Sequence, residues 1–536
     1  MVSGWGRASD LADGARGPSP AHGPTPRRRP DHSRPGSGSG SGSTSPGSRP
    51  GSRPGSRRRP DDARSAAPRR PDAARSAAFD LLRAVDEQDA YANLVWPGIL
   101  ASHRLTGRDA AFATELAYGT LRWRGRHDAV LAACLDRSLD AVQPTLRDVL
   151  RLGVHQLHQM RVGTHAAVDE SVELASARVN RGAAGLVNAV LRRVARGGGP
   201  DEWLAQLVHD GTVPAFADDP AGHLAVATSH PEWIVRAVHE ALAASQPERS
   251  WADTRTALLA DNSPASVTLA ARGLSSAELL DRVRAQGAIA QPGRWSRTAV
   301  RVSAVNPAAL PEVATGVAGV QDEGSQVVAL ALADAHLDGP DQRWLDLCAG
   351  PGGKAALLAA EVARRGGELT AVELHPHRAE LVRASLRPVQ GRHRVLVGDA
   401  LHLELGHVEL GQGYDRVLLD APCTGLGALR RRPESRWRRS PADLAELTAL
   451  QRRLLGRALE VVRPGGWVLY VTCSPHLAET EAVLADVGRF AGQVVPIGDV
   501  AGVQLPPDSV AGGLLRLWPH LHDTDGMFAA FVQRTA

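Results

Sequence analysis

The sequence predicts a multidomain protein: an all-helical N-terminal domain, a small α/β connector, and a C-terminal α/β domain with a doubly wound, mostly parallel sheet. Three observations predict this order. From residue 75 to residue 196 apolar residues recur at i, i+3, i+4 and i+7, the spacing of amphipathic helices. The Gly-Gly-Gly-Pro run at 197–200 interrupts that spacing. From residue 341 on, short apolar runs alternate with helical stretches, which is typical of a parallel sheet.

The first segment, residues 1–74, is of low complexity and rich in Gly, Ser, Pro and Arg. Such a composition cannot bury enough apolar surface to offset the entropy lost on ordering, so we expect a disordered tail. Residues 1–70 hold fourteen Arg, five Asp and no Lys or Glu, whereas the whole chain has a formal charge of only +4. The tail is therefore basic. It is expected either to have no role or to attract RNA loosely, and the composition favours neither.

Residues 75–196 are expected to be helical throughout. Val187, Val190, Leu191 and Val194 form one apolar stripe at helical spacing, and no strand-like alternation intervenes in this region. The helical domain is therefore expected to end at the Gly-Gly-Gly-Pro run.

Residues 197–330 combine two patterns. Strand-like SVTLAA and AVRVSAV stand beside the helical SSAELLDRVRAQ, which predicts a linker and a small α/β connecting domain. Residues 331–536 form the C-terminal α/β domain, in which five strands are expected: RWLDLC, ELTAVE, RVLVG, RVLLD and GWVLYVTC. Ligands of such sheets bind outside the carboxyl ends of the strands.

The composition points to an intracellular protein. The 536 residues include four cysteines (Cys134, Cys348, Cys423 and Cys473), far apart and without a C-x-x-C pair, so neither a zinc site nor a disulfide framework is expected. Reduced thiols favour the cytoplasm. No run of 18 apolar residues exists, and the N-terminus lacks the apolar core of a secretory signal. We therefore expect a cytoplasmic protein with no metal and no membrane-spanning helix.

A glycine-rich stretch, CAGPGGKAALLAA, follows the first predicted strand of the C-terminal domain. Gly350, Gly352 and Gly353 let the backbone approach a ligand, and the helix from about Lys354 presents free N–H groups there. Lys354 is the only lysine among 62 basic residues, which favours a site that needs a compact ammonium. The stretch is not a Walker A motif, because Ala355 follows the lysine, and it lacks the G-x-G-x-x-G spacing.

Acidic residues stand at the ends of the next three predicted strands: Glu373, Asp399 and Asp420. An acid at the end of the second strand is where a ribose diol is held in related folds. Each acid could instead cap the helix that follows it. Three acids at successive strand ends favour a pocket for a nucleoside with hydroxyls, an amine and a cationic centre, and S-adenosylmethionine has all of these.

Two cysteines stand at predicted strand-to-loop junctions. Cys423 lies in DAPCTGLG and Cys473 in YVTCSP, each followed by Thr or Ser and flanked by Pro. In an open α/β sheet both would lie at the edge that holds the cofactor pocket, where nearby helix N-termini can lower a thiol pKa. Cys134 lies within an amphipathic stretch and is expected to be a core residue.

The stretches LDLCAGPGGK, DAPCTGLG and YVTCSP, in this order, resemble the signature motifs of the RNA cytosine-5 methyltransferases. Two motif cysteines mark the RNA enzymes of this class. RDAAFATELAYGTLRWRGR, THAAVDESVELA and GLVNAVLRRV resemble the antitermination factor NusB. A NusB-like domain fused to this catalytic domain is similar to a family of small-subunit ribosomal RNA methyltransferases. The resemblance covers about residues 72–536 and implies a Rossmann-like, S-adenosylmethionine-dependent methyltransferase domain behind a NusB-like RNA-binding domain.

The resemblance implies roles for individual residues. Cytosine C5 is a poor nucleophile, and a thiolate that adds to C6 makes an enamine whose C5 can take a methyl group. It implies that Cys473 attacks C6, that Cys423 assists β-elimination of the product, and that Asp420 binds the N3 edge. The implied co-substrate is S-adenosylmethionine, with no metal, and the implied partner is 16S ribosomal RNA, with protein partners unknown. The residues implied to bind S-adenosylmethionine are Cys348, Ala349, Gly350, Pro351, Gly352, Gly353, Lys354, Glu373, Asp399 and Asp420.

The chain departs from the family motifs at a few positions. Members commonly have C-A-A-P-G-G-K-T, where this chain has Gly350 and Ala355. Both residues are small and are expected to leave the loop intact. Glu373 stands where Asp is also common, and Arg436 stands where Lys is frequent.

Six arginines and Trp437 follow Cys423 in the stretch GALRRRPESRWRR. Arginine clusters can hold phosphates, and tryptophan can stack on a base. A solvated basic loop is the alternative, but the adjacency to Cys423 favours RNA contact. A target cytosine would have to leave its stack to reach the pocket.

Two further hypotheses stay open on the sequence. The chain could methylate transfer RNA or a small molecule; the NusB-like domain and the arginine-rich stretch argue against a small molecule but do not exclude transfer RNA. It could instead be a binding protein with an inert C-terminal domain, against which the cofactor acids and both cysteines argue.

Overall fold

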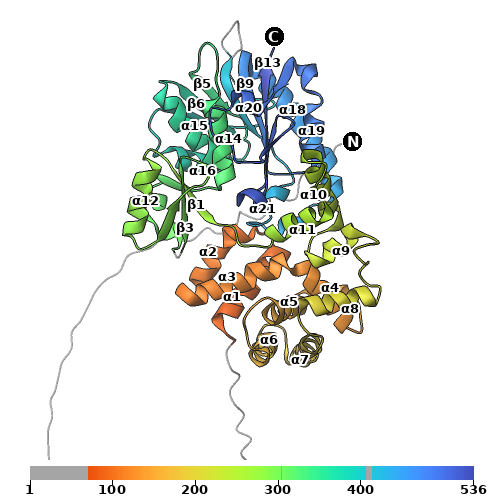
Figure 1. Ribbon diagram of the computed structural model, residues 1–536. Helices are drawn as coiled ribbons and strands as arrows, with labels where there is room; N and C mark the ends of the chain where they lie inside the picture. The colour runs from red at the N-terminus through yellow and green to blue at the C-terminus, as the bar shows by residue number, and fades with distance from the viewer. Residues whose placement is uncertain (1–70, 304, 406–412, 536) are drawn as a thin grey trace, which may run out of the picture. The chain divides into compact units, whose positions relative to one another are not determined.

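The computed structural model describes residues 71–303, 305–405 and 413–535 (Figure 1). Residues 1–70 of the predicted tail lie outside this described part. The last residues of that tail are not tail-like, because Ala73 and Ala74 begin helix α1 (Ala73–Glu87). The Asp72 carboxylate caps the helix by accepting the N–H groups of Ala74 and Arg75 at 2.7 and 3.2 Å.

The N-terminal part is all-helical, as the apolar spacing predicts. The stripe of Val187, Val190, Leu191 and Val194 is buried in its core. Each fully buried aliphatic side chain of this size contributes about 1.5–3 kcal/mol, so the stripe holds its helix against its neighbours. After α1, the helices are α2 (Ala92–Ser102), α3 (Gly107–Arg122), α4 (Arg124–Cys134), α5 (Pro144–His158), α6 (Thr164–Arg178) and α7 (Arg181–Arg196).

The predicted connector is helical in its first half, which the sequence did not predict. Helix α8 begins at Pro200 of the Gly-Gly-Gly-Pro run, where a missing N–H breaks no helical hydrogen bond. Its Trp203 and Leu207 join the core of the N-terminal helices. The run therefore ends one helix and starts the next, and the domain boundary at residue 196 stays a prediction. The helices here are α8 (Pro200–His209), α9 (Pro220–Ala227), α10 (Glu232–Ser245) and α11 (Trp251–Ala260).

The second half of the connector is α/β, as predicted. SVTLAA and AVRVSAV contain strands β1 (Val267–Ala271) and β3 (Ala299–Ser303). They belong to a four-stranded antiparallel sheet of order β2-β3-β1-β4. The other elements are α12 (Ser276–Ala285), β2 (Ile289–Pro292), α13 (Pro311–Ala314) and β4 (Ala318–Val320).

The C-terminal domain is built on a mixed sheet. Its order within the described residues is β11-β12-β13-β9-β8-β5-β6-β7, with β10 paired to β13. The five predicted strands form its parallel part. The order reverses between β5 and β8, and ligands bind outside the carboxyl ends of the strands at such a switch point. These strands are β5 (Arg343–Asp346), β6 (Glu368–Glu373), β7 (Arg392–Val397), β8 (Tyr414–Asp420) and β9 (Val462–Thr472).

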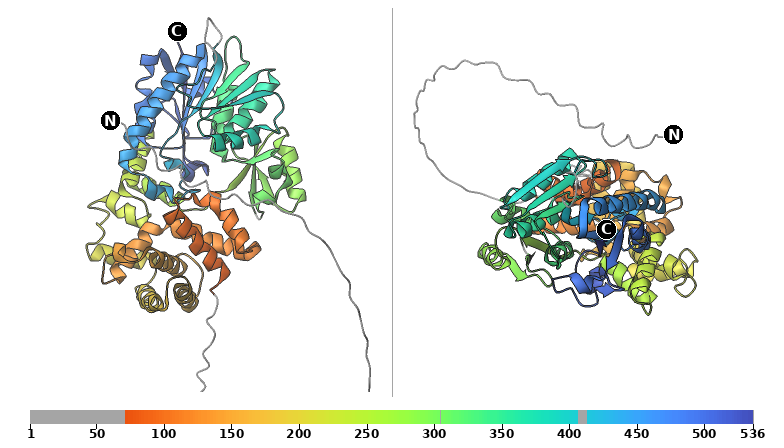
Figure 2. Two further views of the ribbon diagram at one scale, coloured as in Figure 1. Left: turned by 180° about the vertical axis from the view of Figure 1, so that it is seen from behind. Right: turned by 90° about the horizontal axis from the view of Figure 1, so that it is seen from above.

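Helices cover both faces of this sheet (Figure 2). One face packs against α14 (Glu323–Asp334), α15 (Gly353–Arg364), α16 (Pro376–Leu386) and α20 (Ile497–Val500). The other packs against α18 (Pro441–Val461) and α19 (Glu481–Leu484). This two-sided burial explains why the parallel strands are apolar on both faces.

The antiparallel edge was not predicted. Strand β13 (Met527–Arg534) pairs with β9 so that Phe528 lies opposite Thr472, next to Cys473. It thereby fixes the end of β9 at the predicted site. The other strands of this edge are only two to four residues long, too short for an alternating pattern: β10 (Gly492–Val495), β11 (Val510–Ala511) and β12 (Leu514–Leu517).

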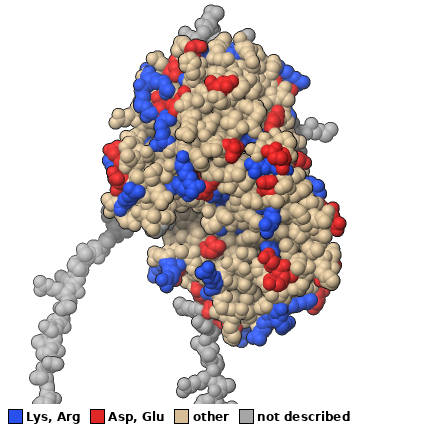
Figure 3. Space-filling model, in the orientation of Figure 1, with Lys and Arg blue, Asp and Glu red and all other residues tan. Residues whose placement is uncertain are grey.

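The surface carries no single basic field on the face shown in Figure 3, where basic and acidic side chains are interspersed. Attraction of RNA to that face would therefore depend on local groups. Within the described residues, no helix is long and apolar enough to cross a membrane.

Candidate active site

Cys423 and Cys473 lie side by side at the carboxyl edge of the sheet. Their Sγ atoms are 3.4 Å apart, within hydrogen-bonding distance for sulfur. Cys473 directly follows β9, and Cys423 lies three residues beyond Asp420, the last residue of β8. These parallel strands are adjacent, with Asp420 opposite Val471, so their register brings the two loops together.

The residue after each cysteine ties the two loops to each other. The hydroxyl oxygens of Thr424 and Ser474 are 3.1 Å apart. Glu479, which is fully buried, accepts the Thr424 N–H at 2.8 Å and the Gln451 side-chain amide at 3.1 Å. These donors compensate the burial of the carboxylate. Sequence reasoning missed Glu479, although it follows Cys473 by only six residues.

The surroundings give the two thiols different proton affinities. The hydrogen bond from Cys423 lowers the pKa of Cys473; burial opposes this, and the positive charge of Lys354 adds to it. The contact with Cys473, burial and the negative charge of Glu479 together raise the pKa of Cys423. Cys473 therefore loses its proton more readily than Cys423. The Cys423 thiol donates the hydrogen bond to the Cys473 sulfur. The thiolate is the nucleophilic form of cysteine.

Lys354 links the glycine-rich loop to this pair. It lies in the first turn of α15, and its Nζ donates to Asp420 Oδ2 at 2.7 Å. Burial lowers the pKa of Lys354, but Asp420 more than offsets this, so the net pKa is raised and the side chain stays an ammonium. The lysine that the sequence singled out therefore bridges the candidate cofactor loop and the candidate catalytic acid.

The loop between β5 and α15 needs glycine at Gly352. Its φ of +105° lies in the left-handed region, and an added Cβ would lie 2.9 Å from the Cα of Val382. The loop is held from below by the Ala349 N–H, which donates to the carbonyl of Val372 in β6 at 2.8 Å. Burial and nearby carboxylates raise the pKa of Cys348, so this thiol stays protonated. The loop residues are Cys348, Ala349, Gly350, Pro351, Gly352 and Gly353.

Glu373 occupies the space that a side chain at Gly350 would need. A Cβ added to Gly350 would lie 2.0 Å from Glu373 Oε2 and 2.8 Å from Arg378 Nη2. The carboxylate is held there, because Glu373 Oε1 accepts the His375 N–H at 3.0 Å and pairs with Arg378 at 3.5 Å. Glycine at position 350 is therefore not equivalent to the alanine that family members commonly have there. The expectation that Gly350 simply leaves the loop intact is incomplete. In this chain Gly350 and the longer acid Glu373 fit each other.

Asp399 follows β7 and lies near Glu373, since the Gly398 N–H donates to the Glu373 carbonyl at 3.0 Å. Its own carboxylate accepts the Leu401 N–H at 3.0 Å and contacts His402 Nδ1 at 2.8 Å. Burial raises the pKa of Asp399, but these two contacts outweigh it, so the pKa is lowered. Asp399 is thus an ionised, half-exposed acid at the same sheet edge.

Asp346, the last residue of β5, is an acid at this edge that sequence reasoning missed. It is buried, and among the described residues neither carboxylate oxygen has a hydrogen-bond partner. Burial and the negative charge of Asp420 raise its pKa to about 8. A buried carboxylate without a hydrogen-bond partner in the protein indicates that its partner comes from outside the chain, as a bound ligand would. The signal was present, since Asp346 ends the first strand in LDLCAGPGGK.

The arginine-rich stretch after Cys423 is largely internal. Arg430 pairs with Asp523 at 3.0 Å, and Arg431 pairs with Asp322 at 2.8 Å. Both contacts join the stretch to other parts of the chain rather than leave the guanidinium groups free. The prediction of RNA contact is therefore wrong for these two arginines.

Arg436 and Trp437, in the short helix α17 (Ser435–Arg438), are also internal. Arg436 is fully buried and donates to Asn262 Oδ1 at 2.8 Å and to the carbonyls of Ser229 and Arg122 at 3.0 and 3.1 Å. The Trp437 ring packs where a Cβ on Gly125 would stand. The expected RNA contact is wrong for Arg436 as well, because the side chain is buried and its Nη1 bonds to groups of this chain.

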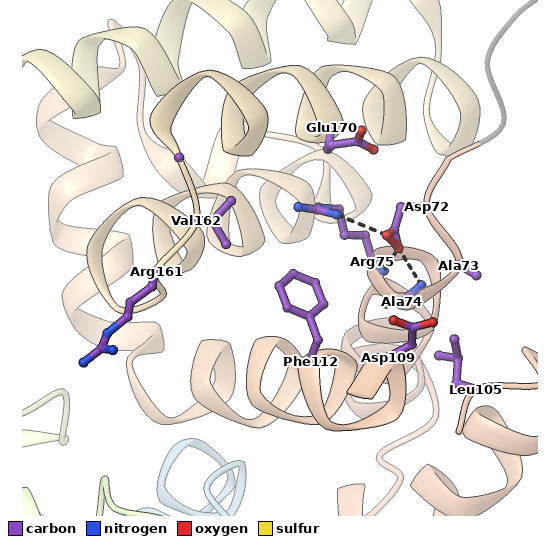
Figure 4. A pocket seen from close by; sticks show the side chains of 11 residues that line it. Asp72, Ala73, Ala74, Arg75, Leu105, Asp109, Phe112, Arg161, Val162 and Glu170 are labelled. Carbon is purple, nitrogen blue, oxygen red and sulfur yellow. Dashed lines mark hydrogen bonds and ion pairs between the residues drawn. The ribbon is translucent and has the colours of Figure 1, made fainter. Parts of the chain in front are cut away.

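A cavity of about 680 Å³ lies among the N-terminal helices, away from the cysteines (Figure 4). Arg75 at its centre pairs with Asp72 at 3.1 Å and lies 5.1 Å from the centre of the Phe112 ring. No lining residue comes from the segments that carry Cys423 or Cys473. This cavity therefore does not coincide with the candidate active site.

Comparison with known proteins identifies the family. The chain is 48% identical over 489 residues to "Putative methyltransferase Rv1407" of Mycobacterium tuberculosis, covering 89% of this chain and 98% of that one. It is 32% identical to "Ribosomal RNA small subunit methyltransferase B" of Xanthomonas campestris, covering 80% and 90%. The family model described as 16S rRNA methyltransferase RsmB/F matches residues 335–533. The chain belongs to the RsmB/F family of rRNA methyltransferases.

Other matches agree with this RsmB/F assignment. The NusB family model matches residues 72–196. "Probable ribosomal RNA small subunit methyltransferase B" of Bacillus subtilis is 30% identical, covering 85% of this chain and 98% of that one. The crystal structure of PH0851 shares the fold, with a TM-score of 0.68, 21% identity, and coverage of 88% of this chain and 99% of that one. The NusB-like helical domain and the Rossmann-like methyltransferase domain predicted from the sequence are confirmed.

Methyltransferases of this family use S-adenosylmethionine as methyl donor, and the residues at the sheet edge fit it. The Glu373 carboxylate at the end of β6 would accept the ribose hydroxyls. The first turn of α15 offers unpaired N–H groups to a carboxylate. The unpartnered carboxylate of Asp346 would accept an ammonium, which would also hold it ionised. The ribose, carboxylate and ammonium groups of the ligand would thus each meet a group of matching chemistry.

The fit of Gly350 to Glu373 makes a prediction. Gly350→Ala is expected to weaken S-adenosylmethionine binding by about tenfold, because overpacking of this kind costs about 1–3 kcal/mol. Glu373→Asp in the same chain should restore most of the affinity, since the shorter acid leaves room for the methyl group. Isothermal titration calorimetry on both single variants and the double variant gives the coupling energy. Additive effects, or wild-type affinity in Gly350→Ala, would show that the two positions are independent.

Proposed function

We propose that this RsmB/F-family chain transfers a methyl group from S-adenosylmethionine to C5 of a cytosine in 16S ribosomal RNA. The observation that carries the proposal is the pair of thiols 3.4 Å apart at the cofactor edge. A single activated thiol suffices to attack a base, whereas a second thiol beside it offers a proton acceptor for a later step. The relatives named as rRNA methyltransferases support the choice of RNA.

In the proposed reaction Cys473 is the nucleophile. Its thiolate adds to C6 of the cytosine, which places an electron pair on C5. S-adenosylmethionine supplies the methyl group as an electrophilic sulfonium. Lys354 and the Cys423 thiol, which stabilise the Cys473 thiolate before attack, need no movement to do so. This arrangement favours the thiolate form of Cys473, which is the nucleophilic form.

Asp420 is proposed to hold the pyrimidine during addition. Adding a thiolate to C6 raises the basicity of N3, which takes up a proton from solvent. The Asp420 carboxylate would accept a hydrogen bond from that N3–H, and the proton returns to solvent when Cys473 leaves. Lys354 fixes Asp420 through Oδ2 at 2.7 Å, so the acid is oriented before RNA binds. After methylation the Cys423 thiol gives its proton to solvent, and the resulting thiolate takes the proton from C5. The C5–H electron pair then forms the C5=C6 double bond, and the C6–S bond breaks to release the Cys473 thiolate.

The experiment that tests the proposal follows the product. The full chain is incubated with S-adenosylmethionine labelled in its methyl group and with 16S RNA transcribed without modifications, beside a transfer RNA pool. We expect 5-methylcytidine in the nucleosides of 16S RNA, identified by mass spectrometry. Label in transfer RNA alone would show that transfer RNA, not 16S RNA, is the substrate. Label in a nucleoside other than 5-methylcytidine would contradict methylation at C5 of cytosine. Methylation of 16S RNA would place the protein in the cytoplasm, where ribosomes assemble.

A further inference from the structure

One arginine of the stretch after Cys423 differs from its neighbours. Arg432 is exposed, and within the described part of the chain its guanidinium forms no ion pair. Its neighbour is an aromatic ring, because it lies 5.4 Å from the ring centre of Tyr91. Tyr91 precedes α2 in the NusB-like domain and is 41% exposed. An arginine without an ion pair and a partly exposed aromatic ring therefore meet at the surface.

This pair lies close to the reacting cysteine. The backbone N–H of Gly427 donates to the Cys473 carbonyl at 2.8 Å, and the N–H of Arg432 donates to the Ala428 carbonyl at 3.0 Å. One short turn therefore connects the nucleophile to Arg432. The positive charge of Arg432 is also among the causes that lower the pKa of Cys473, as expected for a guanidinium within electrostatic reach of the thiol.

The Tyr91 loop is held in place by the same stretch. Arg438 donates to the Ala90 carbonyl at 2.6 Å and lies 5.2 Å from the Tyr91 ring centre. The buried Glu434 accepts the Ala92 N–H at 3.1 Å. Contacts on both sides of Tyr91 thus fix a loop of the NusB-like domain against the segment that follows Cys423. The position of the ring is built into the fold rather than left to a free loop.

We propose that Arg432 and Tyr91 form a contact for the RNA strand that carries the target base. The Arg432 guanidinium binds a backbone phosphate, and the Tyr91 ring stacks on an unpaired base next to the target. This inference rests on the proposed function and names the part of the chain that holds the flanking nucleotides. Base–aromatic stacking and phosphate–arginine contacts are the usual means of holding single-stranded RNA. A base removed from its stack also leaves its neighbours to be supported.

The test measures binding of unmodified 16S RNA by the full chain, with the transfer RNA pool measured beside it. Filter binding is repeated between 50 and 200 mM salt, conditions over which phosphate contacts show clearly. Arg432→Gln is expected to weaken binding and to reduce the slope of log affinity against log salt by about 0.7, the value for one phosphate contact with a single strand. Tyr91→Ala is expected to weaken binding about tenfold with the slope unchanged, and Tyr91→Phe to bind as wild type.

Two controls match these variants. Phe216 is an aromatic side chain with the same exposed fraction as Tyr91, 41%, and Arg489 is a surface arginine whose side chain is 80% exposed. Phe216→Ala and Arg489→Gln are expected to bind RNA as wild type. S-adenosylmethionine affinity should stay within about twofold in every variant, because none touches the glycine loop.

Two results would overturn the proposal. Wild-type affinity and salt slope in both Arg432→Gln and Tyr91→Ala would show a surface pair that binds no RNA and would overturn the proposal. A shifted pH profile of methyl transfer in Arg432→Gln with unchanged RNA affinity would also overturn it, because Arg432 would then act only on Cys473. Because RNA affinity is measured apart from methyl transfer, failure of this contact is distinct from failure of the proposed reaction.

Discussion

Replacing Cys473 with alanine is expected to lower methyl transfer to RNA by roughly 10⁴-fold or more, while S-adenosylmethionine affinity stays within about twofold. The loss is large because the proposed reaction passes through a covalent bond between Cys473 and the base. Cys423 is 3.4 Å away, but its pKa is raised by the contact with Cys473, by burial and by Glu479, so it is a poor thiolate. The measurement is single-turnover transfer of labelled methyl to 16S RNA.

A second cysteine variant serves as the matched control. Cys134 is buried in α4 of the NusB-like domain, and burial raises its pKa to about 11. Cys134→Ala should therefore methylate RNA as wild type. If Cys473→Ala keeps a rate within about tenfold of wild type, the covalent mechanism is wrong, and RNA methylation would have to proceed without a cysteine nucleophile.

The positions of the site residues could be predicted because strand ends converge. Apolar runs located β5, β6, β7, β8 and β9, and in a parallel sheet the residues after such strands meet at one edge. That rule placed Glu373, Asp399 and Asp420 at one edge, and it placed the two cysteines together. It holds without side-chain detail, since the register of neighbouring parallel strands is set by the backbone.

Pairing of side chains could not be predicted from the same sequence. Arg430, Arg431 and Arg436 are the residue type expected at a nucleic-acid site, but each pairs with an acid or a carbonyl from a distant part of the chain. A local sequence does not show which partner folds onto it. The fit of Gly350 to Glu373 is of the same kind, because it joins residues of different strands. The helices at 200–260 were missed because their apolar spacing is short and is interrupted by prolines: Pro200 and Pro220 begin helices, and Pro231 directly precedes one.

Replacing Cys423 with alanine is expected to trap a covalent complex between the protein and its RNA. Once C5 carries the methyl group, it still holds its proton, and Cys473 cannot leave C6 until that proton is removed. Cys423 is the group beside Cys473 that can take it. Without this thiol the adduct should persist as a band that migrates slowly on a denaturing gel and contains label from both RNA and S-adenosylmethionine.

The change in charge during the reaction explains how Cys423 becomes a base. Before attack, its contact with Cys473 is the first cause that raises its pKa. When Cys473 becomes a thioether it can no longer carry a negative charge, so that cause disappears and the pKa of Cys423 falls. In the proposed reaction, Cys423 would therefore lose its proton only after the adduct has formed, and the two cysteines would act in that order.

The amount of adduct should depend on both cysteines. It should require Cys473, and it should increase when Cys423 is removed. The double variant Cys423→Ala with Cys473→Ala should form no slow band, because the sulfur that attaches to C6 is absent. Omitting S-adenosylmethionine should also reduce the band, since an unmethylated adduct can reverse by losing Cys473 directly. Free RNA on the gel together with sustained methylation by Cys423→Ala would show that another group accepts the C5 proton, and Cys423 would then only position Cys473.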